Sequence, residues 1–156
     1  MRILFVCLGN ICRSPTVEAV ARELARREAP ALKLEFDSAG TAGYHIGDPP
    51  DARSVQAGRR RGYDLSALRA RQLQAADFER FELLLAMDEQ NLVEMQSLAP
   101  QGHAGRAKLF LSFAPETGRL SVPDPYYGDA AGFNTVLDLA EHGVRGMLRS
   151  LGAAQR

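Results

Sequence analysis

The chain has few cysteines, no excess of charge and no long apolar run. Its only two cysteines are Cys7 and Cys12. They are too few for a disulfide framework, and no set of Cys and His residues has the spacing of a structural zinc site. Basic and acidic residues number 19 each, so the formal net charge is zero. Because no overall basic field favours polyanions, we expect neither a nucleic-acid partner nor a membrane partner.

The beginning of the chain also lacks targeting signals. Residues 1–10 read MRILFVCLGN, which has no long apolar core before a small-residue cleavage site and is too short to span a bilayer. We therefore expect a reducing intracellular compartment, the cytoplasm. With 46% apolar and 24% charged residues, the 156 residues predict one globular domain over 1–156.

Short apolar runs alternate with helical patterns along the chain. The expected strands are residues 3–6, 34–37, 81–87 and 107–111. The expected helices are residues 15–28, 52–61 and 89–98, and apolar residues between 133 and 148 mark a long closing helix. We expect Ser14 to cap the first helix and Pro15 to be its first residue, with Glu18 and Arg22 away from its apolar face. The alternation predicts an α/β fold, a four-stranded parallel doubly wound sheet flanked by helices on both faces.

The segment VCLGNICRS, residues 6–14, suggests a site for an oxyanion. Cys7 ends the first apolar run, and Arg13 stands at the start of the first helix. The five residues between them can form a loop whose backbone N–H groups point inward, and a helix N-terminus behind such a loop attracts anions. The same field, with the Arg13 guanidinium, would stabilise the thiolate of Cys7 and make it a nucleophile.

Other polar segments also follow predicted strands. Asp37 and Ser38 end the second strand, Asp88 follows the third, and the loop 122–128 follows the fourth. Ligands of parallel doubly wound sheets bind beyond the carboxyl ends of the strands. We therefore expect these segments to meet Cys7 at one edge of the sheet.

Four motifs carry a resemblance to a known family. They are VCLGNICRSP at 6–15, DSAGT at 37–41, AMDEQNL at 86–92 and DPYYG at 124–128. Over essentially its whole length the sequence resembles the low-molecular-weight protein tyrosine phosphatases. The resemblance implies hydrolysis of phosphotyrosine in protein substrates through a cysteinyl-phosphate, with inorganic phosphate as product and no metal or other cofactor. We expect a monomer or a weak dimer.

The resemblance also assigns roles to individual residues. It implies that Cys7 is the nucleophile, Arg13 the bidentate phosphate clamp and Asp124 the general acid. The phosphate-binding residues would be Leu8, Gly9, Asn10, Ile11, Cys12 and Arg13. The supporting hydrogen-bonding groups would be Asn10, Ser14 and Ser38, and the aromatic rim would be Tyr44, Tyr126 and Tyr127.

The implied chemistry is consistent with these residue types. Inward N–H groups and Arg13 can stabilise the equatorial oxygens of a transferring phosphoryl group, and the planar guanidinium matches two oxygens at once. Asp124, between Pro123 and Pro125, can protonate the departing phenolate and later activate water. A deep slot with aromatic walls favours phosphotyrosine, because phosphoserine is too short to reach its floor.

The roles of several residues can be interpreted in two ways. Cys12 can pack the loop, or it can form a disulfide with Cys7 as a redox partner that protects the nucleophile. Asp88 can cap a helix or lie near Arg13. His45 follows Tyr44 and could touch the substrate, whereas residues 59–61, all arginine, are most simply a solvated helix face.

Three other functions compete with tyrosine phosphatase activity. Arsenate reduction on the same scaffold needs further relay cysteines beyond Cys12. Phosphoarginine hydrolysis is associated with threonine at the position of Ile11, and the apolar Ile11 favours an aryl phosphate instead. A non-catalytic phosphotyrosine-binding or redox-sensing protein is the third, and the intact catalytic positions argue against it.

Overall fold

A computed structural model describes residues 1–154. Its strands form one parallel sheet in the order β2-β1-β3-β4. The strands are β1 (Arg2–Cys7), β2 (Glu35–Gly40), β3 (Leu83–Ala86) and β4 (Ala107–Leu109). The order places the first strand in the interior of the sheet and confirms the predicted parallel, doubly wound α/β fold.

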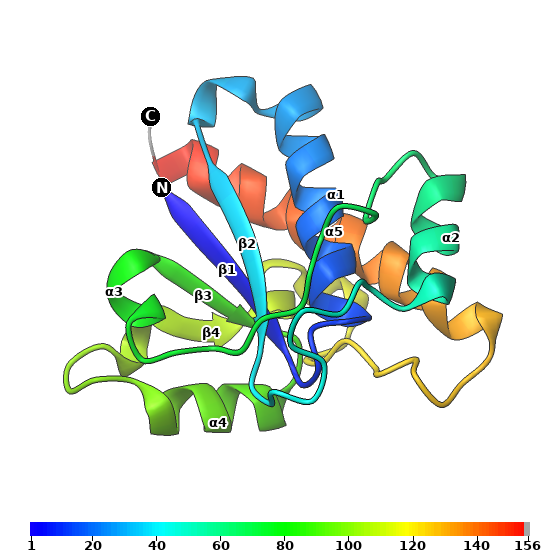
Figure 1. Cartoon of the computed structure of the whole chain (residues 1–156). Helices are drawn as coiled ribbons and strands as arrows, with labels where there is room; N and C mark the ends of the chain where they lie inside the picture. Colours follow the sequence, from blue (N-terminus) through cyan, green and yellow to red (C-terminus); the bar gives the residue numbers. More distant parts are fainter. Residues whose placement is uncertain (155–156) are drawn as a thin grey trace.

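Helices cover both faces of this sheet (Figure 1). The α-helices are α1 (Arg13–Glu28), α2 (Ala52–Arg60), α3 (Asp77–Arg80), α4 (Glu89–Leu98) and α5 (Ala130–Ala154). Short 3-10 helices span Pro30–Leu32, Ala104–Arg106, Phe110–Phe113 and Pro115–Thr117. Helices α1 and α5 pack on each other on one face, and α4 packs on β3 and β4 on the other. No helix within residues 1–154 is both long and apolar enough to cross a membrane.

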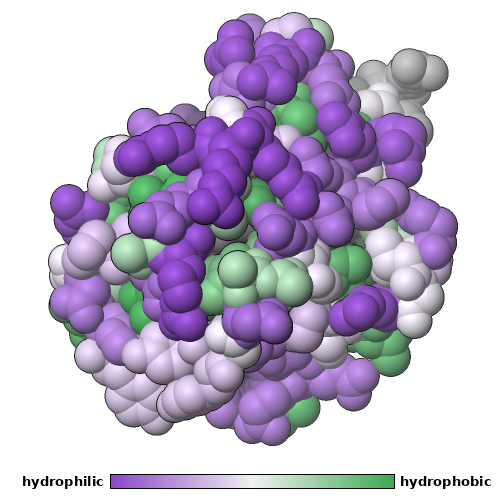
Figure 2. Space-filling model, turned by 90° about the vertical axis from the view of Figure 1, so that its right-hand side faces the viewer, coloured by the Kyte–Doolittle hydropathy of each residue, from purple (hydrophilic) through white to green (hydrophobic). Residues whose placement is uncertain are grey.

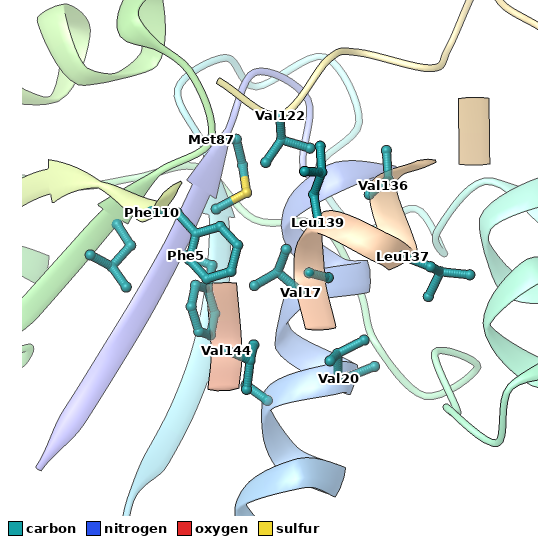
Figure 3. Close-up of a cluster of buried hydrophobic side chains, with 14 of the residues drawn as sticks. Phe5, Val17, Val20, Met87, Phe110, Val122, Val136, Leu137, Leu139 and Val144 are labelled. Atoms are coloured by element: carbon teal, nitrogen blue, oxygen red, sulfur yellow. The ribbon is translucent and has the colours of Figure 1, made fainter. Parts of the chain in front are cut away.

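The first strand is buried on both faces, as its continuous apolar sequence predicts. Ile3 and Phe5 belong to the core shared with α1 and α5, whereas Leu4 and Val6 belong to the core beneath α4. In the first of these cores, Phe5 meets Phe110 edge to face with ring centroids 5.8 Å apart, and Figure 3 shows them among the aliphatic side chains of α1 and α5. This packing fixes β1, and therefore the loop that follows it.

The register of the sheet brings the predicted site segments together. Cys7 is aligned with Gly40 at the end of β2, and Val6 with Ala86 at the end of β3. A Cβ atom on Gly40 would lie 2.7 Å from the carbonyl oxygen of Leu8, a distance that real Cβ atoms do not reach. Glycine therefore allows β2 to end directly against the loop after β1.

Several element boundaries differ from those expected, and the third and fourth strands, Leu83–Ala86 and Ala107–Leu109, are shorter. The second strand runs to Gly40 instead of residue 37, because it stays paired with β1 as far as Cys7. Helix α1 begins at Arg13 with Cys12 as its N-cap residue and no side-chain cap, so Ser14 is not the cap; its hydroxyl contacts Cys7 instead. Helix α5 begins at Ala130, before the first apolar residue of its pattern.

Candidate active site

The Cys7 sulfur lies at the end of β1, beneath the loop formed by residues 8–12, and only 2% of the residue is exposed. The backbone N–H of Asn10 donates to Sγ at 3.2 Å, and the Ser14 hydroxyl lies 3.0 Å from Sγ. The N-terminus of α1 stands behind the same loop. Two hydrogen bonds and a helix terminus therefore surround the sulfur, and each of them stabilises a negative charge.

Asn10 is the centre of the loop's hydrogen bonding. Its backbone is left-handed, with φ of 59°, a conformation that asparagine tolerates better than most residues. Its side-chain Nδ2 donates to Ser14 at 2.8 Å and to Ser38 at 2.9 Å, while Oδ1 accepts from the backbone N–H of Arg71 at 3.0 Å. Because the N–H of Arg71 can only donate, it fixes which end of the amide faces the serines.

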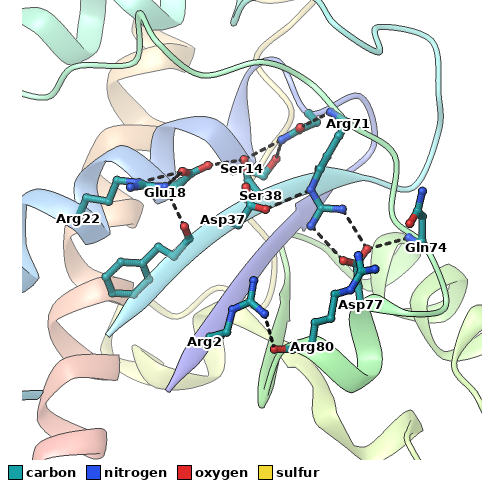
Figure 4. A network of polar contacts seen from close by, with 12 residues as sticks. Arg2, Ser14, Glu18, Arg22, Asp37, Ser38, Arg71, Gln74, Asp77 and Arg80 are labelled. Carbon is teal, nitrogen blue, oxygen red and sulfur yellow. Dashed lines mark hydrogen bonds and ion pairs between the residues drawn. The ribbon is translucent and has the colours of Figure 1, made fainter. Parts of the chain in front are cut away.

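The network continues from Ser38 to the protein surface (Figure 4). The Ser38 hydroxyl donates to Glu18 at 2.7 Å, and Glu18 accepts from the Arg22 guanidinium at 2.9 Å. Glu18 is only 2% exposed, although the sequence places it away from the apolar face of its helix. Burial raises the pKa of Glu18, although the hydrogen bonds from Ser38 and Arg22 partly oppose the shift. The helix pattern alone could not show that Ser38 needs this carboxylate as an acceptor.

The Arg13 side chain is buried and its guanidinium is held by two groups. It donates to Asp88 at 2.6 Å and to the carbonyl oxygen of Val122 at 3.2 Å. Burial acts to lower the pKa of Arg13, but the charges of Cys7, Asp88 and Asp124 raise it above the ordinary value. The guanidinium therefore remains charged, and its direction is set before any ligand arrives.

Asp88 combines the two interpretations that the sequence left open. One carboxylate oxygen accepts from the N–H of Asn91 at 2.7 Å and caps α4. The other oxygen pairs with Arg13. The residue that caps α4 therefore also orients the Arg13 guanidinium.

Asp124 lies on the segment 122–128, which we call the acid loop. The loop is fixed at one end by the N–H of Val122, which donates to the carbonyl of Met87 at 2.7 Å. The Asp124 carboxylate accepts from the N–H of Tyr126 at 3.1 Å and lies 3.7 Å from a guanidinium nitrogen of Arg13. Its side chain is 43% exposed, so it can exchange protons with solvent and still reach a ligand bound to Arg13.

A cavity of about 240 Å³ opens above the sulfur. Its lining comprises Cys7, Leu8, Gly9, Ile11, Cys12, Arg13, Tyr44, His45, Asp124, Tyr126 and Tyr127. The three tyrosines are at least 37% exposed and border it from two loops that are distant in the sequence. His45 is hydrogen-bonded to Asp48 at 3.2 Å and packs close to Gly9.

Cys12 is buried and lies outside the hydrogen bonds of the Cys7 sulfur. Both cysteines are free thiols in this structure. Burial, with a smaller contribution from Asp51, raises the pKa of Cys12 to about 12. Cys12 therefore remains protonated at neutral pH, and its role as a redox partner stays a prediction.

The assembled groups suit attack on a phosphorus atom. They comprise a sulfur that accepts the N–H of Asn10, a guanidinium held by Asp88 and Val122, and a carboxylate that is accessible to solvent. Within the described part of the chain, no three His, Cys, Asp or Glu side chains are grouped so that they could hold a metal ion.

Sequence reasoning missed Glu18, Arg71, Asp51 and Arg53. Arg71 acts through its backbone N–H, which no side-chain pattern reveals, while its guanidinium pairs with Asp77 and Asp37 at 3.1 Å. Asp51 caps α2, and Arg53 contacts the acid loop. The spacing of Glu18 and Arg22, four residues apart, was the one available signal for that pair.

Comparison with known proteins identifies what the chain is similar to. A family model described as low molecular weight phosphotyrosine protein phosphatase matches residues 2–156. The Bacillus subtilis low molecular weight protein-tyrosine-phosphatase YfkJ is 38% identical, covering 96% of this chain and 94% of its own. The human low molecular weight phosphotyrosine protein phosphatase is 43% identical over 86% of this chain and 85% of its own.

Solved structures agree with these sequence matches. The crystal structure of a protein tyrosine phosphatase from Entamoeba histolytica with Hepes in the active site superposes with a TM-score of 0.95 and 35% identity, covering 100% of this chain and 99% of that one. The crystal structure of YfkJ gives a TM-score of 0.92 and 36% identity, covering 100% and 97%.

Proposed function

The chain belongs to the low molecular weight phosphotyrosine protein phosphatase family, and we propose that it hydrolyses phosphotyrosine through an intermediate in which phosphate is bonded to Cys7. The observation that carries this mechanism is the setting of the Cys7 sulfur. It accepts the N–H of Asn10, lies 3.0 Å from the Ser14 hydroxyl and faces a cavity that Arg13 and Asp124 also line.

In the first step, the Cys7 thiolate attacks phosphorus and an S–P bond forms. The bond between phosphorus and the phenolic oxygen breaks, and the protonated carboxyl of Asp124 gives its proton to that oxygen. Arg13 and the loop N–H groups bind the equatorial oxygens, where negative charge is concentrated in the transition state. Tyrosine leaves as the neutral phenol.

In the second step, the Asp124 carboxylate takes a proton from water, and the water oxygen attacks phosphorus. The S–P bond breaks, inorganic phosphate is released, and Cys7 returns to the thiolate. Asp124 is then protonated again and ready for the next substrate. The partial exposure of its side chain supports this role, because water must enter after the phenol has left.

The lining of the cavity supports an aryl phosphate as substrate. Ile11 presents an apolar side chain at the loop, and Tyr44, Tyr126 and Tyr127 can contact a phenyl ring from the sides. The alternatives of arsenate reduction and phosphoarginine hydrolysis are not favoured, because the relatives reported above are named as tyrosine phosphatases.

The natural substrates in this proposal are phosphotyrosine proteins, which leave inorganic phosphate as product. We place the protein in the cytoplasm, where a free nucleophilic thiol stays reduced, and expect it to act as a monomer or a weak dimer.

The proposed function is tested by comparing phosphotyrosine, phosphoserine and phosphoarginine as substrates in the presence of EDTA. We expect phosphotyrosine to be hydrolysed fastest and the rate to be the same without EDTA, because the chain's own groups supply the nucleophile and the charge stabilisation. Released phosphate is the measurement, and orthovanadate should inhibit competitively in the samples without EDTA, because EDTA binds vanadate. Faster turnover of phosphoarginine, or loss of activity in EDTA that a divalent ion restores, would contradict the proposal.

Replacing Asp124 with alanine tests the general acid. Asp124→Ala should lower kcat/KM for phenyl phosphate by about 10²-fold or more, the usual contribution of a positioned acid. The loss for 4-nitrophenyl phosphate should be much smaller, because nitrophenolate departs without a proton. kcat/KM is the measurement, since it covers the steps up to cysteinyl-phosphate formation. Equal losses for both esters would remove Asp124 from this role.

A further inference from the structure

Arg53 lies on the first turn of α2 and joins three parts of the molecule. Its guanidinium pairs with Asp51, donates to the carbonyl oxygen of Tyr126 at 2.9 Å and covers the ring of Phe133 at 4.7 Å. No step of the mechanism proposed above uses this residue. We propose that Arg53 is a positioning residue for Asp124, holding the acid loop against the phosphate-binding loop. The inference rests on the proposed function, because it presumes that Asp124 is the acid.

The first link runs from the phosphate-binding loop to Arg53. The backbone N–H of Asp51 donates to the carbonyl of Ile11 at 2.8 Å, so Asp51 is fastened to the loop that surrounds the sulfur. The Asp51 carboxylate accepts from the Nε of Arg53 at 3.0 Å and from its Nη2 at 2.9 Å. This fork-to-fork pair fixes the direction of the guanidinium more tightly than a single contact could.

The second link runs from Arg53 to the acid. Arg53 binds the carbonyl of Tyr126, and the N–H of the same residue donates to the carboxylate of Asp124. The two bonds lie on either side of the Tyr126 Cα atom. Arg53 therefore restrains the residue whose N–H orients the acid, and without it that part of the loop is free to turn.

Arg53 also makes a second contact with the acid loop, through the Tyr126 ring. Its guanidinium lies 5.6 Å from the centroid of the Tyr126 ring, within the range of a cation–π interaction. Arg53 thus contacts both the backbone and the ring of a residue that borders the cavity. The face of the molecule that carries α2 is largely hydrophilic (Figure 2), so an arginine there is not unusual in itself. The contacts of the Arg53 guanidinium are nevertheless specific, because it pairs with Asp51 and binds the carbonyl of Tyr126.

The same helix offers a matched control. Arg60 is exposed on α2, and its side chain makes no hydrogen bond or ion pair within residues 1–154. Arg60→Met removes one exposed guanidinium from α2, as Arg53→Met does, but it leaves the acid loop untouched. A difference between the two variants therefore reports the contacts of Arg53 and not the loss of positive charge.

The experiment measures kcat/KM for phenyl phosphate and 4-nitrophenyl phosphate. The variants are Arg53→Met, Arg53→Lys, Arg60→Met, Asp124→Ala and the double variant Arg53→Met with Asp124→Ala. For Arg53→Met we expect about a tenfold loss on phenyl phosphate, the effect of losing one charge-assisted hydrogen bond, and little loss on 4-nitrophenyl phosphate. Arg60→Met should match the wild type on both esters. The double variant should match Asp124→Ala alone, because Arg53 has no acid left to position.

Three results would overturn the inference. They are equal losses on both esters in Arg53→Met, a further loss when Arg53→Met is added to Asp124→Ala, and wild-type values for phenyl phosphate in Arg53→Met. Arg53→Lys keeps the charge and perturbs the fold less. Its kcat/KM for phenyl phosphate should lie between those of the wild type and Arg53→Met, because an ammonium lacks the planar fork that contacts both Asp51 and Tyr126. If Asp124→Ala itself discriminates between the esters but the Arg53 variants do not, the proposed function stands and this inference alone fails.

Discussion

Cys7→Ser is expected to abolish turnover while the protein still binds phosphate. The hydroxyl is a far weaker nucleophile than a thiolate, so we expect kcat to fall by at least about 10⁴-fold, the scale of loss when a covalent nucleophile is removed. The phosphate-binding loop and Arg13 remain in place. Orthophosphate should therefore bind at least as tightly as in the wild type, since a neutral hydroxyl repels the anion less than a thiolate does.

Two measurements check this expectation. Released phosphate from 4-nitrophenyl phosphate gives the turnover, and calorimetric titration with orthophosphate gives the affinity. Cys12→Ala is the matched control, because it removes the other buried thiol of the loop, and measurable turnover should remain in it. Near-normal turnover in Cys7→Ser would show that another group attacks phosphorus.

After Cys7→Ser, Arg13→Lys is expected to cause the largest loss of catalytic activity. Lysine keeps the positive charge but loses the planar fork that meets two phosphate oxygens together. It also cannot donate to Asp88 and the carbonyl of Val122 while reaching a ligand, as the guanidinium can. We expect kcat/KM to fall by about 10²- to 10³-fold, the loss seen when a donor to the transition state is removed.

The comparison with alanine explains why lysine is the better test. Arg13 is buried beside Asp88, and removing one partner of a buried pair costs about 3–5 kcal/mol because the other charge is left uncompensated. Arg13→Ala would therefore combine a loss of stability with a loss of catalysis. Thermal unfolding should show that Arg13→Lys remains folded at the assay temperature, and kcat/KM close to the wild type in a folded protein would contradict the role of the fork.

Much of the site follows from the sequence because the strands are parallel. Cys7 ends β1, Ser38 lies near the end of β2 and Asp88 follows β3. The carboxyl ends of these parallel strands meet at one edge, so placing the strands was enough to bring the three residues together. The register of the sheet adds a detail that composition could not supply. Gly40 must be a glycine because a neighbouring carbonyl oxygen occupies the space of its side chain.

The remaining residues escaped prediction for physical reasons. Glu18 has a charged side chain on a surface-type helix pattern, yet it is buried because Ser38 and Arg22 provide its hydrogen bonds. Arg53 binds the backbone carbonyl of Tyr126. Every residue has a backbone carbonyl, so the sequence does not indicate which one accepts this hydrogen bond. Ser14 was wrongly expected to cap α1, but its other expected role, a hydrogen bond to the Cys7 sulfur, agrees with the 3.0 Å contact.

The hydrogen bonds of Asn10 have a consequence for the speed of the chemical step. Its amide gives one proton to Ser14 and one to Ser38, so each serine must send its own hydroxyl proton elsewhere, Ser14 to the sulfur and Ser38 to Glu18. With Cys7 as the thiolate, this arrangement of protons gives every group of the hydrogen-bond network a partner. The hydroxyl dipole of Ser14 is thus already aligned when phosphate enters, and the sulfur changes charge with little reorganisation of its surroundings.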